Sequence, residues 1–383
     1  MGLVVTAEKV RGFSLFSLVL ILLGYGVRIA INWGTEDGLS RDFLCFWAVS
    51  DLTLQGAAAS AFDLEVLGPV ERSIGAKLFT WSYPPIFQLM TLPLALLPPV
   101  ASQVLWCLAG SSIFAFGLKR VLPERYALLA ACSTSLFLAN IYLGQTGICI
   151  TAFYLLGTLG LAASPRRLPW GAAAFGLAAI KPHIGLLIPI LLIIRREWHA
   201  LAVATGALLI FAAASLLVFG PELWSVFFQM SGTTLELLNA SQYKLHLLSS
   251  FFSAFHSLGV PTTGAFILHG LLASAVIGVA IRFIWISRDT QLAVALAIAA
   301  GLLIFPYVYY YDLLLLTAPL AILIRHGLAG GWLANEKGLL VLLWLGPLPL
   351  IAFAEVLEVS LGVGFPVIAC FMIVRRIRHV SEA

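Results

Sequence analysis

Long apolar runs are the feature that most limits how this chain can fold. Runs of roughly 20 residues recur along the 383-residue sequence, and a helix needs about that length to cross ~30 Å of hydrocarbon. The runs are continuous rather than alternating, which excludes the strands of a membrane barrel, and helices satisfy their backbone polar groups within lipid. Only 10% of the residues are charged, against about 25% in soluble domains. The sequence therefore predicts an all-α polytopic membrane protein.

Twelve runs are predicted to be transmembrane helices of one integral membrane domain over residues 1–383. The first is longer than the apolar part of a signal peptide and lacks a small-residue cleavage site, so we expect it to remain as an anchor. A further run, 86–97, is too short to cross and ends at two prolines, which predicts an interfacial or re-entrant helix. A short amphipathic interfacial helix is expected at 52–67. The predicted spans are 13–31, 101–118, 126–142, 148–163, 170–180, 184–194, 200–219, 264–286, 292–306, 313–324, 339–353 and 361–374.

The distribution of lysine and arginine predicts the side of the membrane on which each loop lies, because cytoplasmic loops carry an excess of basic residues. With the N-terminus cytoplasmic and residues 86–97 not crossing, sixteen of the 22 basic residues fall inside. This arrangement predicts a multi-pass protein of the cell (inner) membrane with both termini inside and two polar outer loops, about 32–99 and about 220–263. The six basic residues on the outer side are Arg28, Arg41, Arg72, Lys77, Lys181 and Lys244.

The same topology gathers polar residues at the outer ends of the helices and in the outer loops. Ionisable residues at membrane depth are costly and usually face a cavity. Their convergence on one side therefore predicts a single site on the extracytoplasmic face. The residues concerned are Asp42, Tyr83, Gln145, Lys181, His183, Lys244, His246 and Asp312.

Asp42 is the candidate for a reacting carboxylate. It precedes an apolar run at the membrane edge, where an aspartate could equally be a helix N-cap. Asp42 and Asp51 could share a metal ion, but no ligand spacing requires one, and we expect no metal and no cofactor. The five cysteines are scattered without a CxxC pair, so neither a disulfide framework nor a zinc site is indicated.

Three further polar breaks interrupt the apolar runs. Gln145 lies in a Gly-Gln-Thr-Gly stretch that is either a tight turn or part of the site. Lys181 ends one run before a proline, where it could bind an anion, or could extend its ammonium to the membrane surface. Four tyrosines precede Asp312, and an aromatic belt at the interface would account for Tyr307 and Tyr309.

The polar breaks, taken together over nearly the whole chain, resemble the pattern of a known family. Their order and their spacing relative to the spans are similar to those of glycosyltransferase family 87, which includes α-mannosyltransferases, within the C-type glycosyltransferase superfamily. The motifs are Arg41-Asp42-Phe43 with Phe46-Trp47 downstream, Tyr83-Pro84-Pro85, Gly144-Gln145, Lys181-Pro182 and Tyr311-Asp312-Leu313.

The resemblance implies the C-type glycosyltransferase fold and an inverting transfer on the outer leaflet from a sugar carried on polyprenyl phosphate. The acceptor would be a lipid or glycan, and the sugar mannose or another hexose or pentose. Asp42 would be the general base, and Lys181, Lys244 and His246 would bind the donor phosphate. The other residues expected to bind substrate are Arg41, Tyr83, Gln145, His183, Tyr311 and Asp312.

The residue types present also suit this chemistry without the resemblance. A sugar hydroxyl that attacks an anomeric carbon needs a base, which a carboxylate can be, and a departing phosphate needs cationic donors, which lysine, arginine or histidine can be. No soluble nucleotide-binding domain fits in the chain, and we expect no nucleic-acid partner. Two alternatives remain at this point. A secondary transporter or lipid flippase shares the twelve-span layout, although no repeat is visible. A membrane scaffold leaves the acidic outer loop unexplained.

Overall fold

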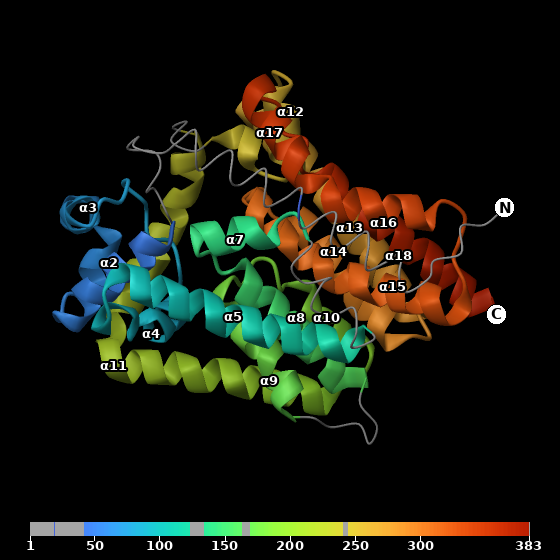
Figure 1. The fold of residues 1–383 in the computed structure, drawn as a ribbon, viewed down its shortest axis with the longest axis horizontal. Coiled ribbons are helices and arrows are strands. Elements are labelled where there is room, and N and C mark those ends of the chain that lie inside the picture. Colours follow the sequence, from blue (N-terminus) through green and yellow to red (C-terminus); the bar gives the residue numbers. More distant parts are fainter. Residues whose placement is uncertain (1–18, 20–41, 123–133, 163–168, 240–243, 383) are drawn as a thin grey trace.

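The computed structural model describes residue 19 and residues 42–122, 134–162, 169–239 and 244–382, and every regular element that these residues form is a helix (Figure 1). The first half contains α2 (Asp42–Leu54), η2 (Ala58–Phe62), α3 (Leu64–Ser73), α4 (Pro85–Thr91), η3 (Leu94–Leu96), α5 (Pro99–Val121), α7 (Phe137–Leu143), α8 (Gly147–Ala162), α9 (Pro169–Leu177), η4 (Ala178–Ile180) and α10 (Leu187–Ile194). The second half contains α11 (Trp198–Asn239), η5 (Leu245–Leu247), α12 (Phe251–Ser257), α13 (Thr262–Ile286), α14 (Thr290–Ile304), η6 (Tyr310–Leu316), α15 (Thr317–Gly330), α16 (Glu336–Leu345), α17 (Pro347–Leu357) and α18 (Gly364–Glu382). The all-α prediction is confirmed for these residues.

Helix α14 forms the centre of the second half. Every side chain from Leu292 to Leu303 is buried, and the helix packs against α8, α10, α13, α15 and α18. A helix that is apolar on all sides is stable only where other elements or lipid surround it. Here the surrounding elements are protein.

Helix α8 connects this centre to the first half, because it packs against α5 and α9 as well as α14. Two glycines allow the α8–α9 contact, since a Cβ atom at Gly171 would lie 2.6 Å from the Cα of Gly160. Small residues of this kind let helix backbones approach closely in membranes. Figure 1 shows α11 running beside α9 and α4, and a non-helical Gly220 followed by Pro221 kinks this long element.

The twelve-span prediction is not confirmed. Among the described residues, four helices are long and apolar enough to cross a membrane, namely 99–121, 198–230, 262–286 and 310–330. The bent pair α16 and α17, which meet at 58°, would make a fifth. Several other predicted spans are shorter helices: α8 has 16 residues and α10 has eight, about 24 Å and 12 Å at 1.5 Å per residue. Residues 13–18, 20–31 and 126–133 lie outside the described residues.

The segment predicted to form the first outer loop differs from its expected secondary structure. The single helix expected at 52–67 is wrong, because Gly56, with φ +83°, interrupts it after α2, and η2 and α3 follow. The short helix expected at 86–97 is present as α4 and η3. With seven residues, α4 is about 10 Å long and is too short to cross the hydrocarbon. Helix α4 packs on α2, which carries Asp42, and on α11.

Candidate active site

Asp42 lies in the first turn of α2, and its carboxylate makes a contact that a simple helix cap would not. Oδ2 accepts a hydrogen bond from Nε2 of Gln145, 103 residues further along the chain. The next side chain, Phe43, is fully buried and fixes this end of α2 in the core. Arg41, predicted to bind substrate, lies outside the described residues.

A tight turn between α7 and α8 brings Gln145 to Asp42. Gly144 has φ +68°, a conformation that residues other than glycine rarely adopt. A Cβ atom at this position would also lie 2.5 Å from the Cβ of Phe43. In addition, Nε1 of Trp106 donates a hydrogen bond to the Gly144 carbonyl oxygen at 3.0 Å. The turn therefore needs a glycine both for its backbone angle and for its contact with α2.

Tyr83 is the third member of the site. Its hydroxyl lies 3.4 Å from Oε1 of Gln145, a long and weak hydrogen bond. Its ring packs against Phe46 and Phe87, with ring centroids 5.5 and 4.4 Å away. Pro85 occupies the first turn of α4, two residues after Tyr83, a position that suits the fixed φ of proline.

Lys181 and Asp312 form a buried ion pair beside Tyr83. Lys181 Nζ lies 2.6 Å from Asp312 Oδ1, and the two residues are 7% and 3% exposed. The ammonium also lies 5.0 Å from the ring centroid of Tyr311 and 5.8 Å from that of Tyr83, within the range of a cation–π contact. These contacts contradict the alternative in which Lys181 extends to the membrane surface.

Six of the predicted site residues therefore form one connected group, which we call the Asp42 cluster: Asp42, Tyr83, Gln145, Lys181, Tyr311 and Asp312.

The other predicted residues have different partners. His183 is half-buried two residues after Lys181, and its ring packs edge-on against Phe305 at 5.7 Å. Lys244 is exposed and pairs with Glu355 of α17 at 3.3 Å. His246 lies in η5 and is half-buried, and among the described residues its Nε2 has no hydrogen-bond partner. The structure thus places Lys244 against α17 rather than in the Asp42 cluster.

Burial raises the pKa of the Asp42 carboxyl from 3.8 to about 6. The hydrogen bond from Gln145 and the positive charge of Lys181 act in the opposite direction, because both stabilise the carboxylate. A group with this pKa is mostly ionised at neutral pH and can accept a proton. Asp51 cannot share a metal ion with it, because nine residues of helix separate them by about 13 Å. Asp51 instead accepts a hydrogen bond from Gln55 at 2.9 Å.

Two buried polar residues, one of which contacts the cluster, were not predicted. Asn140 donates a hydrogen bond to the Tyr311 carbonyl oxygen at 3.0 Å, and a lone asparagine in an apolar run is the signal that could have identified it. Glu71 accepts a hydrogen bond from the Phe79 N–H at 3.0 Å. Burial raises the pKa of Glu71 to about 7. Its place among the other acidic residues of the polar segment gave no such indication.

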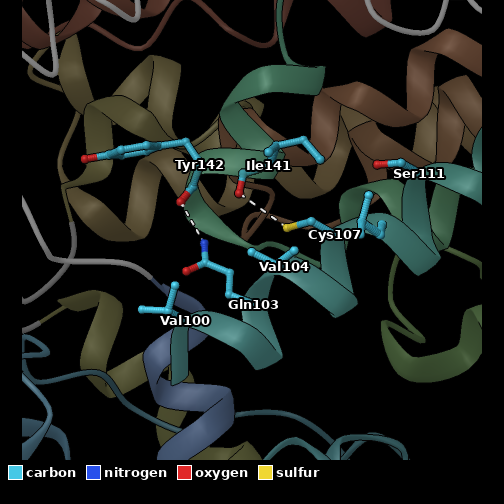
Figure 2. A pocket seen from close by; sticks show the side chains of 8 residues that line it. Val100, Gln103, Val104, Cys107, Ser111, Ile141 and Tyr142 are labelled. Carbon is cyan, nitrogen blue, oxygen red and sulfur yellow. Dashed lines mark hydrogen bonds between the residues drawn. The ribbon is translucent and has the colours of Figure 1, made fainter. Parts of the chain in front are cut away.

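A groove of about 390 Å³ lies between α5 and α7 (Figure 2). Hydrogen bonds join its two walls, from Gln103 Nε2 to the Tyr142 carbonyl oxygen at 3.2 Å and from the Cys107 thiol to the Ile141 carbonyl oxygen at 3.5 Å. Tyr142 lies two residues before Gly144, so the groove adjoins the turn that carries Gln145. The lining residues are Val100, Gln103, Val104, Cys107, Leu108, Ser111, Ile141 and Tyr142.

Comparison with known proteins gives one result. Residues 81–308 match the model of the family described as Glycosyltransferase family 87. The matched range includes Tyr83, Gln145 and Lys181, whereas Asp42 and Asp312 lie outside it. No curated protein and no solved structure matches the chain.

Proposed function

Because the chain belongs to glycosyltransferase family 87 and is therefore a membrane glycosyltransferase, we propose that it uses a polyprenyl-phosphate sugar as donor. In this proposal mannose, or another hexose or pentose, moves to a lipid or glycan acceptor on the outer leaflet of the cell membrane, and the anomeric configuration is inverted. Asp42 is the general base that takes the proton from the acceptor hydroxyl. Membership of a transferase family favours this reaction over the transporter or lipid flippase alternative.

The observation that carries the proposal is the carboxylate of Asp42, held by Gln145 in the same cluster as a buried cation. A base must lie within hydrogen-bond reach of the hydroxyl that it deprotonates and must be ionised at the working pH. The raised but still acidic pKa of Asp42, about 6, meets the second condition. The fixed amide of Gln145 supports the first, because it limits the directions in which the carboxylate can turn.

The departing polyprenyl phosphate needs positive charge near its oxygens. In our proposal Lys181 supplies this charge, while Lys244 and His246 on the second outer loop contact the phosphate when the donor is bound. Arg41, Tyr83, Gln145, His183, Tyr311 and Asp312 complete the substrate site. The mostly apolar groove beside Gly144 supports a lipid-linked donor, because a prenyl chain requires such a surface next to the reacting atoms.

Two experiments test the function together. Mass spectrometry of envelope glycolipids and glycans from cells with and without this protein should reveal one missing sugar. The full chain, purified in lipid nanodiscs, should then transfer that sugar from its polyprenyl-phosphate form and not from its nucleotide form. An unchanged glycan profile together with no transfer from any polyprenyl-phosphate sugar would contradict the proposal.

The orientation of the site gives a separate prediction. In a background without the native cysteines, a membrane-impermeant thiol reagent should label Ser73→Cys in intact cells but should not label Lys337→Cys. Ser73 ends α3 near the site, whereas Lys337 lies in a region rich in basic residues. Both positions should react after permeabilisation. Labelling of Lys337→Cys in intact cells would place that region outside and overturn the proposed topology.

The pKa of Asp42 predicts the acid side of the pH profile. Because a protonated base cannot accept a proton, kcat/KM should rise with pH through an apparent pKa near 6 and then level off. Gln145→Leu removes a hydrogen bond that stabilises the carboxylate, so the rise should move to higher pH. Gln55→Leu is the matched control, because it removes a similar bond to Asp51. An unshifted profile for Gln145→Leu would show that Asp42 does not limit this rise.

A further inference from the structure

Three tyrosine rings form a wall that begins at the Asp42 cluster and extends away from it. Tyr311 and Tyr309 are stacked, with ring centroids 5.2 Å apart and planes only 5° from parallel. Tyr307 meets Tyr309 edge-on at 5.4 Å. All three residues are partly exposed, and the Lys181 ammonium lies over the innermost ring.

The local backbone explains why the rings share one side. The backbone is extended at Tyr309, with φ −79° and ψ 157°, and successive side chains of an extended chain point in opposite directions. Val308, between the two tyrosines, is fully buried, which leaves Tyr307 and Tyr309 on the other side. Tyr311 then follows in the first turn of η6 and stacks on Tyr309.

Hydrogen bonds hold this wall in place. The Ser249 N–H donates to the Val308 carbonyl oxygen at 2.6 Å, and Leu248 and Tyr309 form an isolated antiparallel bridge. The Asp312 carboxylate accepts the Tyr309 N–H at 3.3 Å. The rings are thus fixed before any ligand arrives, which reduces the entropy lost on binding.

An aromatic belt at the membrane interface does not account for this arrangement. Belt residues place single rings at the level of the lipid headgroups, whereas these rings stack on one another and end at a buried cation. The face of an aromatic ring is electronegative, and one face of a pyranose presents C–H bonds that carry partial positive charge. Phenolic hydroxyls can in addition bind sugar hydroxyls.

We propose that Tyr307 and Tyr309 form a carbohydrate subsite for the acceptor, which holds a pyranose ring next to the sugar that Asp42 activates. This inference rests on the proposed function in one respect, since it takes Asp42 and Lys181 to mark the point of reaction. The wall leads away from that point, whereas the donor sugar must remain beside the phosphate, so we assign a ring held at the wall to the acceptor.

Ligand-observed NMR tests the subsite without requiring turnover. The full chain in lipid nanodiscs, free of sugar-based detergent, is mixed with methyl α-D-mannopyranoside or methyl α-D-glucopyranoside, and saturation transfer to the sugar protons is measured. We expect one glycoside to bind, and Tyr307→Leu and Tyr309→Leu to weaken that binding by about 2- to 10-fold, the contribution of an aromatic face. The Phe variants should keep it. Tyr142→Leu, a half-buried tyrosine on the groove, is the matched control.

The possible results distinguish a failure of the carbohydrate subsite from a failure of the proposed transfer reaction. Equal binding by the Leu variants and the wild type, or no binding of either glycoside, would overturn the subsite whether or not transfer occurs. Asp42→Asn should bind the glycoside normally. Displacement of the glycoside by a polyprenyl-phosphate sugar would assign the wall to the donor and overturn the acceptor assignment. Ring-dependent binding in a protein that transfers no sugar would keep the subsite and remove the proposed function.

Discussion

Replacing Asp42 with asparagine is expected to lower the rate of sugar transfer by about 10²- to 10⁴-fold, the usual contribution of a general base. The amide has nearly the same shape as the carboxylate but cannot take the proton of the acceptor hydroxyl. The fold should survive, because the α2 contacts of Phe43 and Phe46 remain. The measurement is a transfer assay on purified variants, with folding checked by monodisperse elution and with donor binding measured separately.

Two other aspartates on the same segment serve as controls. Asp63 is the N-cap of α3 and accepts a hydrogen bond from the Glu65 N–H at 2.9 Å. Asparagine caps a helix about as well as aspartate, so Asp63→Asn should change little. Asp51 accepts a hydrogen bond from the exposed Gln55, and an asparagine amide oxygen can still accept it, so Asp51→Asn should also change little. Near-normal turnover by Asp42→Asn, or equal losses in all three variants, would remove Asp42 from the mechanism.

The helical class could be predicted from the sequence, whereas the number of membrane crossings could not. Hydropathy shows that a segment avoids water, but it does not tell whether lipid or protein surrounds it. Helix α14 illustrates the difference, since Leu292–Leu303 is apolar enough for a span and is buried by neighbouring helices. The failure at 52–67 has a local cause, because one glycine with positive φ ended a helix that the periodicity would have continued.

Most of the candidate site could be predicted because polar residues are rare in this chain. Each of Gln145, Lys181 and Asp312 interrupts an apolar run, and the basic-residue rule predicts that the interruptions lie on one side. Their pairing could not be predicted, because the partners are distant: 131 residues separate Lys181 from Asp312. The burial of Glu71 could not be predicted, because several acidic residues lie on its polar segment and nothing in the sequence distinguishes it from an exposed one.

The buried Lys181–Asp312 pair leads to the second large prediction, on stability. Removing one partner leaves the other charge buried without compensation, which typically costs about 3–5 kcal/mol. Lys181→Met and Asp312→Leu should each lower the thermal unfolding temperature strongly. The double variant Lys181→Met/Asp312→Leu should recover most of the loss, because a buried ion pair can often be replaced by apolar residues without penalty. Thermal unfolding in nanodiscs measures all four proteins.

Donor binding by the double variant separates the two roles of Lys181. If the ammonium holds the donor phosphate, the stable double variant should bind a polyprenyl-phosphate sugar at least ~10-fold more weakly, since a hydrogen bond to a charged group contributes about 1.5–3 kcal/mol. Lys181→Arg, which keeps both the charge and Asp312, should retain part of the affinity. The exposed pair Lys244–Glu355 provides the stability control, because pairs at the surface contribute at most about 1 kcal/mol. A double variant with wild-type donor affinity would show that Lys181 only neutralises Asp312, and the phosphate would then require other cations.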